Sequence, residues 1–310
     1  MGTGGRVALN GRVATAVRAG YRQADMPFLS WLTPLRAALA AVALTLVAPA
    51  LAVTRGEVVS DPDGLRSSVV QIESSGGELC SGALIAPDLI LTAAHCVLQR
   101  AAYRVVVVDR RFRRVAVRAI AAALHPTFVP GTTPRTQPGV DLAILKLARP
   151  LGSDFLPLDP ARASGVGTGD FVEIAGFGLS GEERRGSARV LRSTRLVSLG
   201  TLEASNRVLV VADSERLAET TGAGACRGDS GGPIVRGGPG RYQLLGIVSW
   251  SSGALRSRTA TACGGLTAVT PVSEHEDWIS SRAGDLQRFT VEDAIYRRTA
   301  RSNAYDWSTR

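Results

Sequence analysis

A serine flanked by glycines is the segment of this sequence best suited to chemistry. Ser230 lies in G-D-S-G-G-P, residues 228–233. Its small neighbours leave the hydroxyl open to a substrate carbonyl and permit unusual backbone angles. The N–H groups of Gly228 and Ser230 could then converge on an oxyanion that develops at that carbonyl. Taken alone, the segment could also be a glycine-rich hairpin turn.

A serine hydroxyl is a weak nucleophile without a base, and His95 is the histidine best placed to act as one. It ends an apolar run in T-A-A-H-C, and a disulfide at Cys96 would hold its backbone. His125 lies in a predicted loop, and His275 lies in a predicted helix, on its solvent face. A packed loop histidine is the alternative interpretation of His95.

The base needs a carboxylate that orients it. Asp141 opens D-L-A-I-L, an otherwise apolar strand, and a charge that enters a buried strand must be paired or hydrogen-bonded. An aspartate that merely caps the strand is the alternative. A nucleophile, a base and an orienting acid require no cofactor, and the sequence shows no metal-ligand spacing.

The composition indicates a folded chain that can hold these residues in place. Its 310 residues are 45% hydrophobic and 20% charged, which is typical of a folded protein of one or two domains. The net charge of +9 is spread from Arg6 to Arg310, so no nucleic-acid partner is expected. A basic, soluble surface is favoured over weak affinity for anionic polymers or membranes.

Short β-rich runs alternate with turn residues after residue 52, and this pattern predicts an all-β fold. A proline-bearing connection near 150–165 separates two groups of strands, which indicates two barrels of similar size. A short closing helix is expected at Ser273–Arg282, with Ser273 as its N-cap. The expected strands are Ser68–Glu73, Ala83–Ile85, Leu89–Thr92, Tyr103–Asp109, Val115–Leu124, Leu142–Leu147, Phe171–Phe177, Arg189–Ser198, Arg207–Ala212, Pro233–Val235, Tyr242–Ser249 and Leu266–Thr270.

The N-terminal region predicts export. The stretch Leu35–Ala52, apolar except for Arg36, follows upstream arginines and ends in A-L-A, which is typical of a signal peptide cleaved after Ala52. A membrane anchor is the alternative, although the apolar run is short for a span of about 20 residues. We therefore expect residues 1–52 to be removed and the protein to be secreted or periplasmic, without stable membrane insertion.

The remaining chain is expected to form one folded unit, residues 53–280, and an extension, residues 281–310. The extension could be a packed appendage, a partner-binding tail or a disordered end. An even number of cysteines in an exported chain predicts two disulfides, and three pairings are open at this point. The four residues are Cys80, Cys96, Cys226 and Cys263.

The three chemical segments occur in the order His, Asp, Ser, and over roughly residues 65–280 the chain resembles the chymotrypsin/trypsin-like serine peptidases. The resemblance implies two six-stranded antiparallel β-barrels, with the site in the cleft between them. It implies that Ser230 attacks the scissile carbonyl, that His95 transfers the proton and that Asp141 holds the imidazole. Gly228 and Ser230 would supply the oxyanion hole.

The resemblance also implies the disulfide pairing and the substrate-binding residues. The pairs would be Cys80–Cys96 and Cys226–Cys263. In this family the floor of the primary pocket lies two residues before the cysteine that precedes the serine segment, which is Gly224 here. Ser249 matches a position that hydrogen-bonds the aspartate and lines the substrate strand. Trp250 follows it, and Ser251 stands where many members have glycine, which would narrow the pocket entrance.

Trypsin-like members carry an aspartate at the pocket floor, and this chain has Gly224. A Lys or Arg side chain would be desolvated there without a partner, which is costly. We therefore expect a small or apolar residue at P1, the substrate residue that precedes the scissile bond. An insertion at residues 253–262 departs from the family pattern and leaves the shape of the pocket open.

Activation in this family pairs a new N-terminal amine with the aspartate before the serine, here Asp229. The nearest approximation to the family's start is V-T-R-G at residues 53–56. Cleavage after Ala52 would give Val53 a free amine directly. Cleavage after Arg55, or a different partner for Asp229, are the alternatives.

Together these features predict a secreted serine endopeptidase that hydrolyses protein or peptide substrates through an acyl-enzyme. A proteinaceous inhibitor is a further expected kind of partner. The first alternative is an esterase-like hydrolase with the same three residues, and the second is a non-enzymatic, protease-like binding module.

Overall fold

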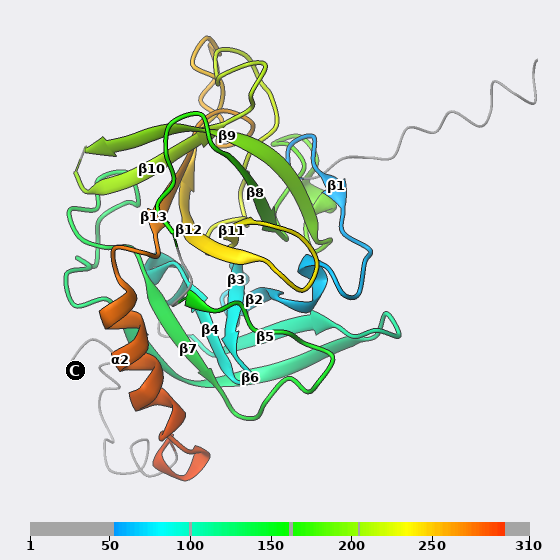
Figure 1. Cartoon of the computed structure of the whole chain (residues 1–310), viewed down its shortest axis with the longest axis vertical. Helices are drawn as coiled ribbons and strands as arrows, with labels where there is room; N and C mark the ends of the chain where they lie inside the picture. The colour runs from blue at the N-terminus through cyan, green and yellow to red at the C-terminus, as the bar shows by residue number, and fades with distance from the viewer. Residues whose placement is uncertain (1–52, 99–100, 161–163, 204, 295–310) are drawn as a thin grey trace, which may run out of the picture. The chain divides into compact units, whose positions relative to one another are not determined.

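The computed structural model describes residues 53–98, 101–160, 164–203 and 205–294. The predicted signal segment, residues 1–52, and most of the predicted extension lie outside these ranges. Within them, no helix has the length and apolar character needed to cross a membrane. The described chain forms two six-stranded antiparallel β-barrels followed by a C-terminal helix, which confirms the predicted fold class (Figure 1).

The first barrel is closed and has the strand order β2-β3-β4-β7-β6-β5. Its strands are rich in Val, Ile and Leu, whose branched side chains pack well on pleated strands. Their largest members are fully buried in its interior. The strands are β2 (Val69–Ser74), β3 (Leu79–Ala86), β4 (Leu89–Thr92), β5 (Tyr103–Val108), β6 (Arg114–Leu124) and β7 (Ala143–Leu147).

The second barrel has the order β9-β10-β13-β12-β11-β8, and pairing between β8 and β9 closes it. A two-residue strand, β1 (Glu57–Val58), adds to the outer edge of β9. The six barrel strands are β8 (Phe171–Gly176), β9 (Arg192–Glu203), β10 (Arg207–Ala212), β11 (Pro233–Arg236), β12 (Gln243–Ser251) and β13 (Thr267–Pro271).

The predicted strands agree with the observed ones to within a few residues at most ends. Leu89–Thr92 and Arg207–Ala212 match at both ends. Strand β9 continues to Glu203 rather than ending at Ser198, because its last residues pair with β10 across a hairpin. The end of β9 is exposed and has no apolar pattern in the sequence, so cross-strand hydrogen bonds rather than a hydrophobic signal extend this strand.

The closing helix differs from its prediction at both ends. Helix α2 spans Glu276–Gln287, and its N-cap is His275, so the expectation that Ser273 caps it is wrong. The His275 N–H closes a turn onto Val272 O, which delays the helix start. His275 is half-buried with its ring 5.2 Å from that of His125, so its predicted solvent-facing position is also wrong.

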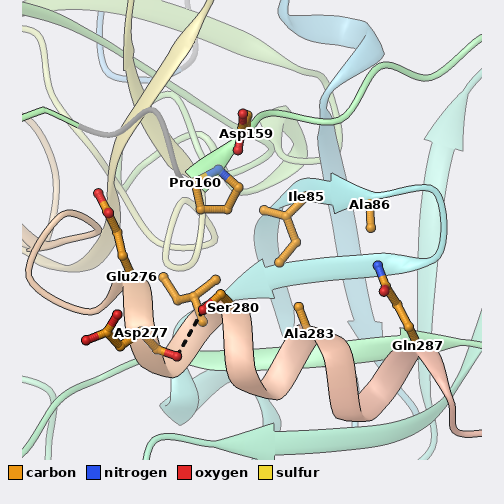
Figure 2. Close-up of a pocket in the computed structure, with 10 residues that line it drawn as sticks. Ile85, Ala86, Asp159, Pro160, Glu276, Asp277, Ser280, Ala283 and Gln287 are labelled. Carbon is orange, nitrogen blue, oxygen red and sulfur yellow. Dashed lines mark hydrogen bonds between the residues drawn. The ribbon is translucent and has the colours of Figure 1, made fainter.

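Helix α2 packs back onto the first barrel beside β7 (Figure 1). Ile279 and Leu286 are buried in the hydrophobic cluster of that barrel. A cavity of about 280 Å³ lies between α2 and β3 (Figure 2). None of the predicted site residues lines it; its lining consists of Ile85, Ala86, Asp159, Pro160, Glu276, Asp277, Ile279, Ser280, Ala283 and Gln287.

Candidate active site

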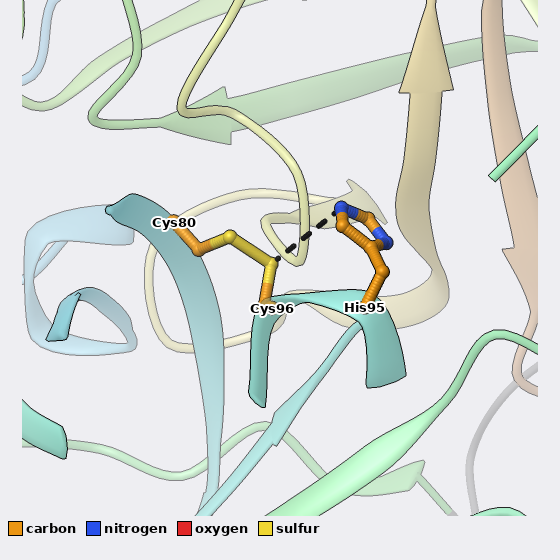
Figure 3. A group of neighbouring side chains, drawn as sticks. All are labelled: Cys80, His95 and Cys96. Atoms are coloured by element: carbon orange, nitrogen blue, oxygen red, sulfur yellow. Dashed lines mark hydrogen bonds between the residues drawn. A yellow bond between two sulfur atoms is a disulfide. The ribbon is translucent and has the colours of Figure 1, made fainter. Parts of the chain in front are cut away.

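His95 is held by a short turn that follows β4. A 3₁₀ turn at Ala94–Val97 carries it, and the disulfide between Cys96 and Cys80 ties this turn to β3 (Figure 3). The His95 backbone N–H donates to Asp141 Oδ1 at 3.0 Å, and its ring Nδ1 lies 2.8 Å from Asp141 Oδ2. Backbone and ring are therefore oriented by one carboxylate.

Asp141 is fully buried just before β7 and accepts a third hydrogen bond, from Ser249 Oγ at 2.6 Å. Burial by itself raises the pKa of this carboxyl. The positive potential of His95 and the hydrogen bonds from His95 and Ser249 outweigh burial and hold the pKa below its ordinary value. The buried carboxylate of Asp141 thus has hydrogen-bond donors and an imidazole beside it. This agrees with the rule that a buried charge must be hydrogen-bonded or paired.

The loop that carries Ser230 belongs to the second barrel but is fastened to the first. Ser81 of β3 donates its N–H to Ser230 O at 2.8 Å and its hydroxyl to Gly228 O at 2.9 Å. The same hydroxyl accepts the N–H of Phe177 at 2.9 Å. Sequence reasoning missed Ser81, and its position directly after Cys80 was the available signal.

The conformation of this loop requires glycine at residue 228. Gly228 has φ +95°, a left-handed angle that side chains disfavour. A Cβ there would lie 2.9 Å from Gly178 Cα, closer than nonbonded carbons approach. Both the backbone angle and the packing therefore require glycine at residue 228, which the sequence predicted to leave space around Ser230.

The Ser230 hydroxyl has a backbone carbonyl rather than His95 as its partner. Its Oγ is 3.5 Å from Ser249 O, and His95 Nε2 is 3.8 Å from Cys96 Sγ. Among the described residues, no hydrogen bond joins Ser230 Oγ to His95 Nε2. Bonds of this type commonly tighten when substrate binds.

The loop that carries Ser230 contains two backbone donors for which the described residues supply no acceptor. The carbonyls of Gly228 and Ser230 both accept hydrogen bonds from Ser81, whereas their N–H groups have no acceptor in the described ranges. Buried or partly buried N–H groups are nearly always paired. Two unpaired donors on one loop are what an oxyanion would require.

Cys80, His95 and Cys96 also bring three potential metal-binding atoms, two sulfurs and a ring nitrogen, within 4.8 Å of one another (Figure 3). Both sulfurs belong to one disulfide. A disulfide offers no thiolate, and the thiolate is the form of cysteine that binds a metal. The disulfide of this group therefore tethers the turn that carries His95.

The atoms nearest to a side chain placed at Gly224 are uncharged. The Gly224 Cα faces the Gly265 backbone and the Thr267 hydroxyl, and the neighbouring Ala225 N–H donates to that hydroxyl at 3.1 Å. Asp213 accepts three backbone N–H groups of its own turn, at residues 215, 216 and 223. Glu219 pairs with Arg256 at 2.9 Å. Both carboxylates are thus already bound by other groups, so neither is a free counter-ion for a basic side chain near Gly224.

The insertion at residues 253–262 folds back beside Ser251. Ser251 Oγ donates to Ala262 O at 2.5 Å, and Gly253 N donates to Thr261 O at 2.7 Å. The second disulfide, Cys226–Cys263, follows at once, so both disulfides have the pairing that the resemblance implied. The insertion is therefore anchored to the same strand end as the pocket wall.

Asp229 is a second buried carboxylate, with 1% of its surface exposed. It accepts the N–H groups of Gly178 at 2.8 Å and Cys226 at 2.9 Å, and no ion pair between described residues reaches it. Burial raises its pKa to about 7, although the two N–H bonds and the more distant Arg192 act in the opposite direction. The carboxylate form thus lacks a cation.

The predicted mature start lies in the second barrel. Val53 is 1% exposed and belongs to the hydrophobic cluster of this barrel. Thr54 and Gly224 exchange backbone hydrogen bonds of 3.1 and 3.2 Å, which join the start of the described chain to the pocket region.

The chain is similar to known proteins over most of its length. The trypsin family matches residues 57–279. Human granzyme M is 32% identical over 237 residues, 71% of this chain and 85% of that protein. The vitellin-degrading protease of Bombyx mori is 29% identical over 230 residues, 70% of this chain and 81% of that protein. Brachyurin of Leptuca pugilator is 27% identical and covers 66% of this chain and 88% of that protein.

A solved structure shares the fold. Human heparin binding protein aligns with a TM-score of 0.56 at 23% identity, covering 73% of this chain and 94% of that protein. At this low identity the similarity supports only the shared double-barrel fold. The family match over most of the described residues, together with the two barrels, shows that the chain belongs to the trypsin family of serine peptidases.

Proposed function

We propose that this protein is a secreted serine endopeptidase in which Ser230 is the nucleophile, His95 the base and Asp141 the orienting acid. The observation that carries the proposal is Asp141, which binds both the ring and the backbone of His95. Ser230 attacks the scissile carbonyl, His95 takes its proton and returns it to the leaving amine, and water then hydrolyses the acyl-enzyme. The N–H groups of Gly228 and Ser230 stabilise the oxyanion.

The substrate would be a protein or peptide with a small or apolar P1 residue. The support is the uncharged atoms nearest to Gly224, together with other partners for Asp213 and Glu219. A basic P1 side chain would be desolvated there without a counter-ion. Ser249, Trp250 and Ser251 would line the bound substrate.

Activation would follow export. Cleavage after Ala52 gives Val53 a free amine, and this cation neutralises Asp229. The support is the burial of Val53, the hydrogen bonds between Thr54 and Gly224, and an Asp229 carboxylate that lacks a cation. Sequencing the N-terminus of the active protein tests this step, since an active enzyme that starts elsewhere contradicts it.

A fluorophosphonate probe and a peptide library test the proposal together. The probe should label the mature protein at Ser230, Ser230→Ala should abolish labelling, and Ser280→Ala should retain it. Library cleavage should follow small or apolar residues, whereas cleavage after Arg or Lys would contradict the pocket assignment. Hydrolysis of simple esters but not peptides would favour the esterase alternative, and no labelling would favour the binding module.

A second candidate function is binding of a sulfated or phosphorylated polyanion, and the arginines around Glu73 favour it. The Glu73 carboxylate forms ion pairs with Arg189 at 2.8 Å, Arg114 at 3.5 Å and Arg104 at 2.5 Å. Three arginines around one carboxylate leave two positive charges in excess. All three arginines are at least half exposed. Retention on a sulfated polysaccharide should fall steeply with salt and weaken in Arg104→Ala but not in Arg195→Ala.

A further inference from the structure

Arg135 lies on the loop between β6 and β7, which is built around one buried side chain. Gln137 is fully buried, and its Oε1 accepts the N–H groups of Val129 and Gly139, each at 2.9 Å. Its Nε2 donates to Val129 O at 2.9 Å and to Thr132 Oγ1 at 2.7 Å. A buried amide with this many partners holds the loop in one conformation, so Arg135 is presented from fixed backbone.

The Arg135 side chain crosses to the second barrel. Its Nη2 donates to Ser251 O at 2.9 Å, and its guanidinium carbon lies 5.2 Å from the centre of the Trp250 ring. The side chain is exposed, and no ion pair between described residues involves it. An unneutralised positive charge therefore lies over the end of β12.

On the side away from β13, no described strand pairs with β12 at Ser249–Ser251. Strand β11 pairs with β12 no further than Ile247. Ser252 N donates to Leu266 O on the β13 side, so the alternation of an antiparallel ladder turns the backbone groups of Ser251 to the other edge. Peptides add to such edges through main-chain hydrogen bonds.

Ser230 sets the register of that peptide. Its Oγ is 3.5 Å from Ser249 O, so P1 lies opposite Ser249, P2 opposite Trp250 and P3 opposite Ser251. Side chains alternate along an extended strand, and P2 and P4 therefore share a face. This is the face on which P2 meets Trp250 and the guanidinium above its ring.

We propose that Arg135 selects substrates that carry Asp or Glu at P2 or P4, an inference that rests on the proposed peptidase function. The P3 N–H of the bound peptide replaces Arg135 as the donor to Ser251 O. The guanidinium stays over Trp250 and turns its freed donors to a substrate carboxylate, the partner that its planar fork fits best.

Matched peptides with one small P1 residue and Glu or Gln at P2, or at P4, test this selection. For an exposed ion pair we expect kcat/KM to favour Glu by about two- to fivefold at one of these positions. The Glu/Gln ratio should fall to near one in Arg135→Ala and below one in Arg135→Glu, in which two carboxylates repel each other. Because it is a ratio, it does not depend on the fraction of variant that folds.

Arg195→Ala is the matched control. Arg195 is also exposed, lies 4.1 Å over the Phe171 ring and carries the same charge, so its loss should leave the ratio unchanged. Fluorophosphonate labelling of Ser230 reports separately on the peptidase function. Labelling combined with a Glu/Gln ratio near one at both positions, or a ratio unaffected in Arg135→Ala, would overturn the selection alone. Absent labelling would overturn the peptidase function and the selection with it.

Discussion

Asp141 and Asp229 are two buried carboxylates of the candidate site, and their surroundings shift their pKa values in opposite directions. Their exposed fractions are 0% and 1%. Asp141 binds the ring and backbone of His95 and the hydroxyl of Ser249, and its pKa is lowered. Asp229 binds two backbone N–H groups, and its pKa is raised to about 7.

The difference shows that the partner of a buried acid, rather than its burial, decides its charge. Burial raises the pKa of both groups. A nearby imidazole and three hydrogen bonds reverse this effect at Asp141, whereas two N–H groups do not reverse it at Asp229. Asp141 therefore ionises more readily than an ordinary carboxyl group, whereas Asp229 keeps its proton up to about pH 7 unless a cation lies beside it.

The largest expected effect is the loss of Asp141's charge. Asp141→Asn keeps the shape but no longer holds the imidazole in the working tautomer, so kcat should fall roughly 10⁴-fold, as in the general Ser-His-Asp mechanism. Steady-state kinetics on a peptide with a small P1 residue measures it. Asp170→Asn removes an exposed carboxylate that pairs with Arg236 and serves as the control. A similar kcat in both variants would contradict the role of Asp141.

The second largest effect is expected on the stability of a protein whose chain continues on the N-terminal side of Val53. In such a protein Val53 has no free amine that could neutralise Asp229. The folded chain keeps the Asp229 proton to about pH 7, whereas the unfolded chain releases it near 3.8. The folded state binds more protons between these values, so stability falls as pH rises from about 4 to about 7. The expected loss is up to about 4 kcal/mol, for three pKa units at about 1.4 kcal/mol each.

Urea unfolding at several pH values measures this loss, with Asp229→Asn in the same extended chain as the reference. The difference between the two proteins removes the contribution of every other titrating group. In a chain that starts at Val53, the amine should neutralise Asp229 and flatten the difference. An extended chain whose difference does not change with pH would show that Asp229 has a cation already.

The smallest effect is expected from Ser249→Ala, which removes one hydrogen bond from Asp141. A hydrogen bond to a charged group contributes about 1.5–3 kcal/mol. The lowered pKa of Asp141 stabilises the fold above the ordinary carboxyl range, and this contribution is lost as pH falls through the folded pKa. Acid unfolding of Ser249→Ala should therefore begin at a higher pH, and Ser249→Thr should restore the midpoint in part. An unchanged midpoint in Ser249→Ala would make the bond energetically neutral.

Much of the fold could be predicted from the sequence because the signals are local. Alternating branched residues and turn residues located the strands, and Leu89–Thr92 and Arg207–Ala212 were predicted end to end. The helix start was predicted less well, since a turn between Val272 and His275 rather than the polar Ser273 determines it. Residue types near Ser230, His95 and Asp141 likewise pointed to one site through three short segments.

Contacts between distant segments could be decided only by the tertiary structure. The sequence indicated that Asp141 and Asp229 each belong to the site, but not that one has a lowered pKa and the other a raised one. Ser81, which fastens the Ser230 loop, and Arg135, which reaches Ser251, stand in segments without any motif of their own. Residue type and spacing record what a side chain can do, whereas its pKa and its partner depend on what the folded chain brings within a few ångströms of it.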